Sequence, residues 1–233
     1  MRDLVPQSIS VNVVSHVRTI MRGTGQFLIT AGLVILLFCV YELYFTGFYT
    51  AREQSHLQDD LTQVWQQPGT REVPDVQLGH GIAVLRIPRL GGKYHKVIVE
   101  GVSRDDLRKG PGHLPETVLP GQLGNFVVSG HRTTYGAPFN RLDELRPGDA
   151  IILETKTTYY TYRETKEQIV KPTDVWVTEP VPGQPGASPT KKLLTFTTCN
   201  PKYSARQRLI IFAELVETTK KPGLPSVIIS GGV

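Results

Sequence analysis

An uncharged stretch near the N-terminus sets the first constraint on what this chain can form. From Gly23 to Tyr41 no residue is charged, and the run includes FLITAGLVILLFCVY. A bilayer core of roughly 30 Å requires about 20 apolar residues in a helix. The uncharged run, together with the apolar residues just after Glu42, supplies that length. We therefore predict a transmembrane helix over residues 26–48.

The charges around this run predict its orientation. Arg2, Arg18 and Arg22 precede it with only Asp3 against them, whereas charges of both signs follow it. The positive-inside rule then puts the N-terminus in the cytoplasm. A cleaved signal peptide is the alternative, but the run exceeds a usual signal core and no A-x-A cleavage site follows. We expect a single-pass protein of the cell membrane, with everything after about Phe48 outside the cell.

The rest of the 233-residue chain is long enough for one globular domain. From about Gln77 to Val216, short β-branched runs alternate with Gly and Pro, which predicts an all-β domain and favours a closed barrel. The net charge of +5 comes from scattered Lys and Arg without a basic cluster, so nucleic acid is not expected as a partner. The predicted strands are Ile82–Ile87, Lys96–Glu100, Asn125–Ser129, Ala150–Glu154, Thr158–Arg163, Gln168–Lys171, Val175–Val177, Leu193–Thr198 and Leu209–Leu215.

Three helical segments are predicted around these strands. Thr50–Gln67 carries apolar residues at helical spacing, Ser103–Asp106 has the spacing of a capping box, and Pro138–Leu145 can form a turn or two. The predicted organisation is a cytoplasmic segment (1–25), a transmembrane helix (26–48), an extracytoplasmic stalk and linker (49–77), the β-domain (78–217) and a tail (218–233), which is either loose or a surface strap.

The two cysteines fall in different compartments of this scheme. Cys39 lies within the span, where we interpret it as an ordinary apolar residue, and Cys199 is alone in the exported domain. Exported domains usually use cysteines in disulfide pairs, so a single thiol is incidental, intermolecular or catalytic. The sequence around Cys199 has to decide between these readings.

Residues 193–215 read LLTFTTCNPKYSARQRLIIFAEL, a strand, a loop and a second strand. If these strands pair, Cys199 and Arg208 stand at the same end of neighbouring strands. A cation there favours the thiolate and can hold negative charge on a carbonyl oxygen. The alternative is a buried cysteine that packs as a small hydrophobe.

A nucleophilic cysteine also needs a proton partner among six histidines. Four of them, His16, His56, His80 and His95, have no catalytic context. His131 directly follows the predicted strand NFVVSG, where a strand delivers a side chain to the end of a sheet. His113, in GPGHLPET, can instead be a local hydrogen-bonding residue. His131 is therefore the candidate.

These segments resemble the sortase family of cysteine transpeptidases. GHRTTYGAPF, LRPGD and LTFTTCNPKYSARQRL are similar to a TLxTC-type strand end, an Arg that opens the next strand and an upstream His, and the similarity covers roughly Gly79–Leu215. The resemblance maps the nucleophile to Cys199, the histidine to His131 and the arginine to Arg208, with Arg206 as runner-up. Phe196 stands where the pattern commonly has Leu, a conservative change on a strand.

Within the family, GHRTTYGAPF and TTCNP look most like class E, the housekeeping sortases of high-GC Gram-positive bacteria. This implies an eight-stranded β-barrel that binds a C-terminal sorting signal, forms a thioacyl intermediate and transfers the signal to an amine of a peptidoglycan precursor. It also implies a signal of the LAxTG rather than the LPxTG type. Tyr135 and Thr198 are further candidates for contacts with the signal, and we expect a monomer with no metal and no cofactor.

Two other classes remain open on the sequence. An L,D-transpeptidase also uses Cys and His on the cell wall, but its nucleophile sits in an SHGC-like string, whereas Cys199 follows Thr-Thr. An anchored β-domain without enzymatic activity would need Cys199 only as a buried residue. A thiol-reactive probe separates these readings, because a buried cysteine reacts slowly in a folded domain.

Overall fold

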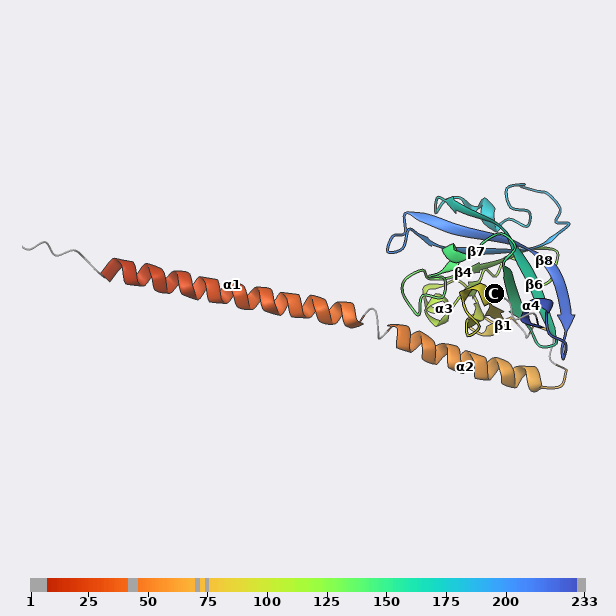
Figure 1. The fold of residues 1–233 in the computed structure, drawn as a ribbon, viewed down its shortest axis with the longest axis horizontal. Helices are drawn as coiled ribbons and strands as arrows, with labels where there is room; N and C mark the ends of the chain where they lie inside the picture. Colours follow the sequence, from red (N-terminus) through yellow and green to blue (C-terminus); the bar gives the residue numbers. More distant parts are fainter. Residues whose placement is uncertain (1–7, 42–45, 70–71, 74–75, 230–233) are drawn as a thin grey trace, which may run out of the picture. The chain divides into compact units, whose positions relative to one another are not determined.

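The computed structural model describes residues 8–41, 46–69, 72–73 and 76–229 (Figure 1). The chain divides into two compact units, Met1–Phe45 and Thr46–Val233, which are considered separately. Several predictions fall partly outside the described residues: the charges at positions 2 and 3, the end of the predicted span at 42–45, parts of the linker at 70–71 and 74–75, and the end of the tail at 230–233.

The first unit contains one long helix, α1 (Ser8–Val40). Within it His16–Val40 is long and apolar enough to cross a membrane, and its side chains are exposed, as they are for Phe27 at 71%. The composition of this helix therefore fits the predicted span. The helix ends at Val40, and residues 46–48 of the predicted span belong to the next helix, α2 (Thr46–Gln66).

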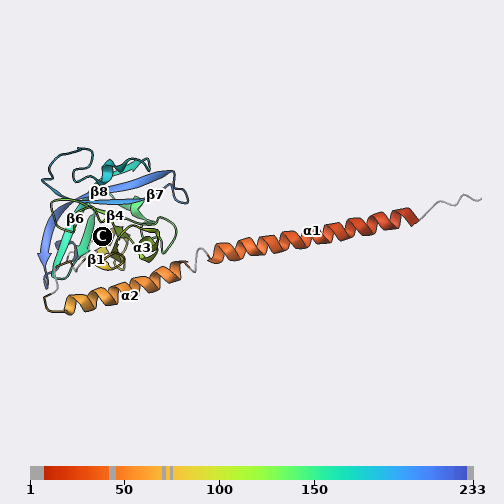
Figure 2. The same cartoon turned by 180° about the vertical axis from the view of Figure 1, so that it is seen from behind.

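In the second unit, the described residues form a closed barrel of eight strands in the order β1-β2-β3-β4-β7-β8-β6-β5. This confirms the predicted fold class, and Figures 1 and 2 show the barrel from opposite sides. Two of the pairings, β2 with β3 and β4 with β7, are parallel. The strands are β1 (Gly81–Arg86), β2 (His95–Glu100), β3 (Gly112–His113), β4 (Gly124–Ser129), β5 (Ala150–Glu154), β6 (Thr158–Val170), β7 (Lys192–Asn200) and β8 (Gln207–Lys220).

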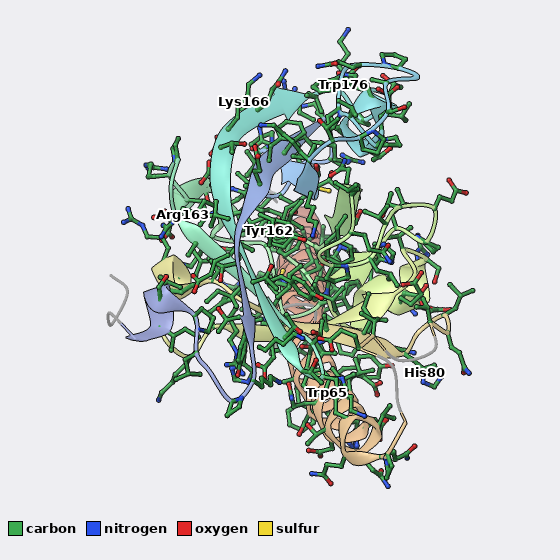
Figure 3. All side chains as sticks on the ribbon, turned by 90° about the vertical axis from the view of Figure 1, so that its right-hand side faces the viewer. Trp65, His80, Tyr162, Arg163, Lys166 and Trp176 are labelled. Atoms are coloured by element: carbon green, nitrogen blue, oxygen red, sulfur yellow. The ribbon has the colours of Figure 1, made fainter. Side chains whose placement is uncertain are left out.

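Alternation along the strands fills the barrel with apolar side chains. Phe126, Tyr162 and Phe196 are fully buried in the main core, and Figure 3 shows Tyr162 in the middle of the barrel. Because the side-chain period of a strand is two, residues of the opposite parity, such as Cys199 on β7, point away from this core. The outer face of β7 and β8 is therefore the face on which Cys199 emerges.

Short helices complete the domain. The capping box predicted at Ser103–Asp106 is present at the start of α3 (Arg104–Lys109). Pro138–Leu145 contains one 3-10 turn, η3 (Leu142–Glu144), and another, η2 (Pro88–Leu90), follows β1. The tail folds back as α4 (Ser226–Ile229), where Ser226 Oγ donates to Glu217 Oε2 at 2.8 Å.

Two strand predictions were wrong. The two strands predicted at Thr158–Arg163 and Gln168–Lys171 are one continuous strand, β6, which carries irregularities near Thr161 and Glu164. The strand predicted at Val175–Val177 is a 3-10 helix, η4 (Val175–Thr178). Val177 is buried against Val170 and Ile210 and Trp176 packs on this cluster, whereas Val175 is exposed, so the apolar residues of η4 pack without pairing in the sheet.

Helix α2, predicted as part of a stalk, lies against the barrel. Its Leu57 and Leu61 are buried in a cluster with Val97 and Val99 of β2. Gln54 accepts a hydrogen bond from the Val97 amide at 2.8 Å and donates to the Val97 carbonyl at 3.0 Å. The helix therefore belongs to the same compact unit as the barrel.

Candidate active site

The Cys199 and Arg208 positions meet across the β7–β8 hairpin. The antiparallel ladder pairs Cys199 with Arg208 and ends one pair further on, at Asn200 and Gln207. Directly opposite residues in an antiparallel pair have side chains on the same face. Cys199 is partly exposed and forms no disulfide, and Arg208 is also partly exposed. A thiol and a guanidinium thus emerge together at one end of the barrel.

His131 reaches the same end from the neighbouring strand. Strand β4 runs parallel to β7 with Ser129 opposite Thr197, and the Gly130 amide donates to the Thr197 carbonyl at 3.1 Å. Continuing this register by two residues puts His131 beside Cys199. Cys199 and Arg208 therefore lie on the paired strands β7 and β8, and His131 lies two residues beyond the end of the neighbouring strand β4.

Arg132 stabilises this arrangement through hydrogen bonds and an ion pair. Its side chain is 3% exposed, its Nη1 donates to the Cys199 carbonyl at 3.5 Å, and its Nη2 pairs with Asp143 Oδ2 at 3.0 Å. Nε of Arg132 donates to the backbone carbonyl of Asn140, and the side-chain Nδ2 of Asn140 donates to the backbone carbonyl of Arg132, both at 2.9 Å. The residue after His131 thus links the Cys199 backbone to the loop that leads into η3.

The surroundings of His131 favour its neutral form. Burial lowers the pKa of its imidazole, and the positive charge of Arg108 lowers that pKa further. The ring lies 5.0 Å from the Tyr135 ring, and Nε2 is buried with no hydrogen-bond partner among the described residues. Nε2 of His131 is therefore not occupied by a hydrogen bond to any of the described residues.

The Arg208 guanidinium uses only some of its hydrogen-bond donors within the protein. Its Nη1 donates to the carbonyls of Ala205 at 2.9 Å and Gln207 at 3.0 Å, whereas its Nε and Nη2 have no hydrogen-bond partner among the described residues. These contacts hold the head of the side chain over the β7–β8 loop. Arg206, the runner-up, is an exposed loop residue that lies outside the Cys199 pair.

The two candidates for signal contacts differ in their environments. Tyr135 is partly exposed beside His131. Thr198 is 3% exposed, and its hydroxyl donates to the Gly130 carbonyl at 2.8 Å, so it ties β7 to the end of β4. The hydroxyl of Thr198 therefore already donates a hydrogen bond within the protein.

His113 has a structural environment. Its Nδ1 lies 2.6 Å from Glu100 Oε2 and its Nε2 lies 2.9 Å from the Thr117 hydroxyl. The side chain is 1% exposed and stacks on Phe126, with the ring centroids 4.8 Å apart. Both ring nitrogens are occupied, which fits the local hydrogen-bonding role that the Gly/Pro loop suggested.

Sequence reasoning assigned no role to Arg132 or Arg108. Arg132 lies inside the quoted GHRTTYGAPF motif, and an arginine directly after a buried strand is the signal that could have identified it. Nothing in the sequence near Arg108 points to Tyr135, which lies 27 positions further along the chain.

The comparison with known proteins agrees with this geometry. A family model described as the sortase domain matches residues 85–216. Sortase SrtE1 of Streptomyces coelicolor is 34% identical over 222 residues, covering 90% of this chain and 61% of that protein. The chain thus spans less than two thirds of the length of this relative.

Two solved structures show the same fold. Sortase E from Streptomyces avermitilis is 42% identical with a TM-score of 0.59, covering 65% of this chain and 99% of that one. Sortase E1 from Streptomyces coelicolor with a tripeptide in its active site is 34% identical with a TM-score of 0.59, covering 64% and 97%. The family match, these class E relatives and the shared barrel together show that the chain belongs to the sortase family of cysteine transpeptidases.

Proposed function

We propose that this chain is a membrane-anchored sortase that cleaves the Thr-Gly bond of a C-terminal sorting signal and transfers the signal to an amine of a peptidoglycan precursor. The observation that supports the proposal is the strand register: Cys199 pairs with Arg208, and β4, which lies beside β7, ends two residues before His131. Family membership alone does not assign roles to these residues, and the strand register supports the assignment proposed here.

The first half-reaction forms a thioester. The Cys199 thiolate attacks the Thr carbonyl carbon, and the carbonyl oxygen takes the negative charge of the tetrahedral intermediate. Nε and Nη2 of Arg208 donate to that oxygen or to the neighbouring peptide. When the C–N bond breaks, protonated His131 gives its proton to the Gly nitrogen, which leaves as an amine.

The second half-reaction reverses these roles. The acceptor amine attacks the thioester carbon, neutral His131 takes a proton from the amine, and the C–S bond breaks to return the Cys199 thiolate. Because burial and Arg108 lower the pKa of His131, its imidazolium is a stronger acid toward the leaving amine than an exposed histidine would be.

Tyr135 is proposed as a contact for the signal, since it is partly exposed beside His131. For Thr198 we propose an indirect role, in which its hydroxyl keeps Gly130, and therefore His131, in register with Cys199. Both roles concern the positioning of the Thr carbonyl rather than bond breaking.

The proposed anchoring follows from α1. A helix of this composition holds the barrel at the membrane, with the N-terminus in the cytoplasm and the barrel outside, near a lipid-linked acceptor. No binding surface for a second copy is required by this scheme, and a monomer is sufficient.

The test uses the full chain in detergent with a signal peptide and a small amine. Wild-type protein is expected to release the fragment that begins with Gly and to form a new amide between Thr and the amine. Cys199→Ala is expected to do neither. Cys39→Ala is the matched control for this variant, because Cys39 lies in the candidate span. Peptide release that gives only the hydrolysed acid at saturating amine would contradict a transferase.

The signal preference is a finer part of the proposal. Alanine at the second signal position offers a backbone N–H that proline lacks. A groove built around that donor disfavours proline by about 1–3 kcal/mol, or roughly ten- to a hundredfold in rate. Two peptides that differ only in Ala or Pro are compared by kcat/KM. Equal values would remove the LAxTG preference without affecting the assignment to the family.

A further inference from the structure

The loop that follows His131 is held by an arginine from a different element. The guanidinium carbon of Arg108, on α3, lies 5.6 Å from the centre of the Tyr135 ring, and Tyr135 in turn lies 5.0 Å from the His131 ring. Arg108, Tyr135 and His131 thus form a continuous row of contacts that ends at the proposed proton donor.

The loop has a reason to need such support. Tyr135 and Ala137 adopt positive φ values of 50° and 42°, and Gly136 between them has a φ of 69°. Left-handed backbone costs a non-glycine residue roughly 1–2 kcal/mol, and such conformations persist only where surrounding contacts impose them. The contact of Tyr135 with Arg108 supplies one of these constraints.

Helix α2 holds Arg108 in place from the other side. The Thr50 hydroxyl donates to the Arg108 carbonyl at 2.8 Å, and Gln54 Nε2 donates to the Lys109 carbonyl at 2.9 Å. These are carbonyls of the last turn of α3, which have no partner inside the helix. Thr50 also lies against the loop, because a Cβ added at Gly136 would meet its Cγ2 at 3.1 Å.

We propose that Arg108 is a positioning residue for catalysis, which orients His131 through Tyr135 and is itself held by Thr50 of the helix that follows the candidate membrane span. This rests on the proposed function of His131. Other charged or titratable groups also face this row: Asp105 and Tyr49 lie near Arg108, and Cys199 lies beside His131 by strand register. The helix nearest the span in sequence is thus part of the active-site framework.

The alternative is that Arg108 only pairs with Asp105 at the surface, at 3.2 Å. Asp105 has 84% of its side chain exposed, and exposed pairs contribute little to stability. The Arg108 side chain is 40% exposed, but its Nε is buried, so pairing with Asp105 does not account for the whole guanidinium. A purely surface role would leave both the titration of His131 and catalysis unchanged when Arg108 is replaced.

Two substitutions separate the charge of Arg108 from its shape. In Arg108→Gln the positive charge is lost, so the pKa of His131 should rise, and kcat should fall about three- to thirtyfold with a smaller change in KM. In Arg108→Lys the charge remains, so the pKa of His131 should stay near the wild-type value while kcat still falls, because an ammonium lacks the planar face that packs on Tyr135. Arg104→Gln, an exposed position on the same helix, is the control.

A third substitution tests the link to α2. Thr50→Val keeps the shape and removes the hydroxyl that reaches the Arg108 carbonyl, and kcat should fall in the same direction. Thr62→Val is its control, since Thr62 is exposed on α2 and bonds only within that helix among the described residues. Unchanged kcat in Thr50→Val would remove α2 from the proposal.

The titration is measured by NMR on the full chain in detergent with labelled histidine, and the His131 signal is assigned by its absence in His131→Asn. An unmoved pKa in Arg108→Gln together with wild-type kcat would overturn the proposal. If the wild-type protein lacked transpeptidase activity, the proposed function would fail, whereas the NMR titration would still report whether Arg108 acts on His131.

Discussion

At the scale of single residues, Arg208 and Arg206 offer a direct comparison. Arg208 pairs with Cys199 in the ladder, whereas Arg206 is an exposed loop residue. Arg208→Lys should lower kcat/KM by at least about tenfold, because a planar fork can contact the oxyanion and the peptide together and an ammonium cannot. Arg206→Lys should retain nearly wild-type activity. Equal losses in steady-state assays of the two variants would remove the case for Arg208.

Glu164 on β6 predicts a pH dependence of stability. It is 2% exposed, both carboxylate oxygens lack a partner among the described residues, and burial with the charges of Asp149 and Glu167 raises its pKa to about 7, against a smaller opposing effect of Arg146. The folded protein therefore binds this proton more tightly than the unfolded chain. Stability from this group is complete below the unfolded pKa near 4.5 and is lost as the pH rises through about 7.

Glu164→Gln removes this ionisation while keeping the shape of the side chain. The variant should be more stable than wild type at pH 8, by up to about 3 kcal/mol, and the difference should shrink toward pH 5. Denaturant unfolding of both proteins across this pH range measures it. A difference that is constant with pH would show that Glu164 ionises normally.

The sequence singled out the proposed catalytic residues but not the arginines that contact the residues around them. Cys199, His131 and Arg208 stand in local motifs, which a strand-end pattern can locate. Arg132 and Arg108 act on groups 67 and 27 positions away, namely the Cys199 carbonyl and the Tyr135 ring. Such contacts depend on how the barrel closes, and although the place of Arg132 after a buried strand could have drawn attention to it, no local pattern shows which group each arginine reaches.

At the scale of elements, the sequence correctly predicted a feature that depends only on residues close together in the chain. The capping box at Ser103 and Asp106 needs only residues three apart, and it forms as predicted. Strand β3 was missed because it has only two residues, Gly112 and His113, and owes its pairing to its neighbours β2 and β4. The 3-10 helix η4 was predicted as a strand because of its β-branched valines, of which Val177 is buried outside the sheet and Val175 is exposed.

The connection between η3 and β7 is a testable element contact. Arg132→Gln removes the hydrogen bond to the Cys199 carbonyl and the ion pair with Asp143. Loss of these buried charge-assisted bonds should lower the free energy of unfolding by about 2–4 kcal/mol. Arg206→Gln, at an exposed position, is the control and should change little. A denaturation midpoint equal in the two variants would argue against the contact.

At the scale of the whole molecule, the orientation in the membrane is a testable prediction. The positive-inside rule, applied to Arg2, Arg18 and Arg22, predicts an N-terminus in the cytoplasm and a barrel outside the cell. Protease added to intact protoplasts should therefore remove the barrel, detected by an antibody against it, while a tag at the N-terminus stays protected. Complete protection of the barrel would refute the proposed topology.

The central claim of this account is that a covalent thioacyl intermediate forms on Cys199. The most direct measurement is intact mass spectrometry of the full chain in detergent after brief incubation with a sorting-signal peptide and no amine. The account predicts a mass increase equal to the peptide up to and including its Thr acyl group, located at Cys199, lost on addition of an amine and absent in Cys199→Ala. An adduct at another residue, or peptide cleavage by Cys199→Ala at the wild-type rate, would contradict it.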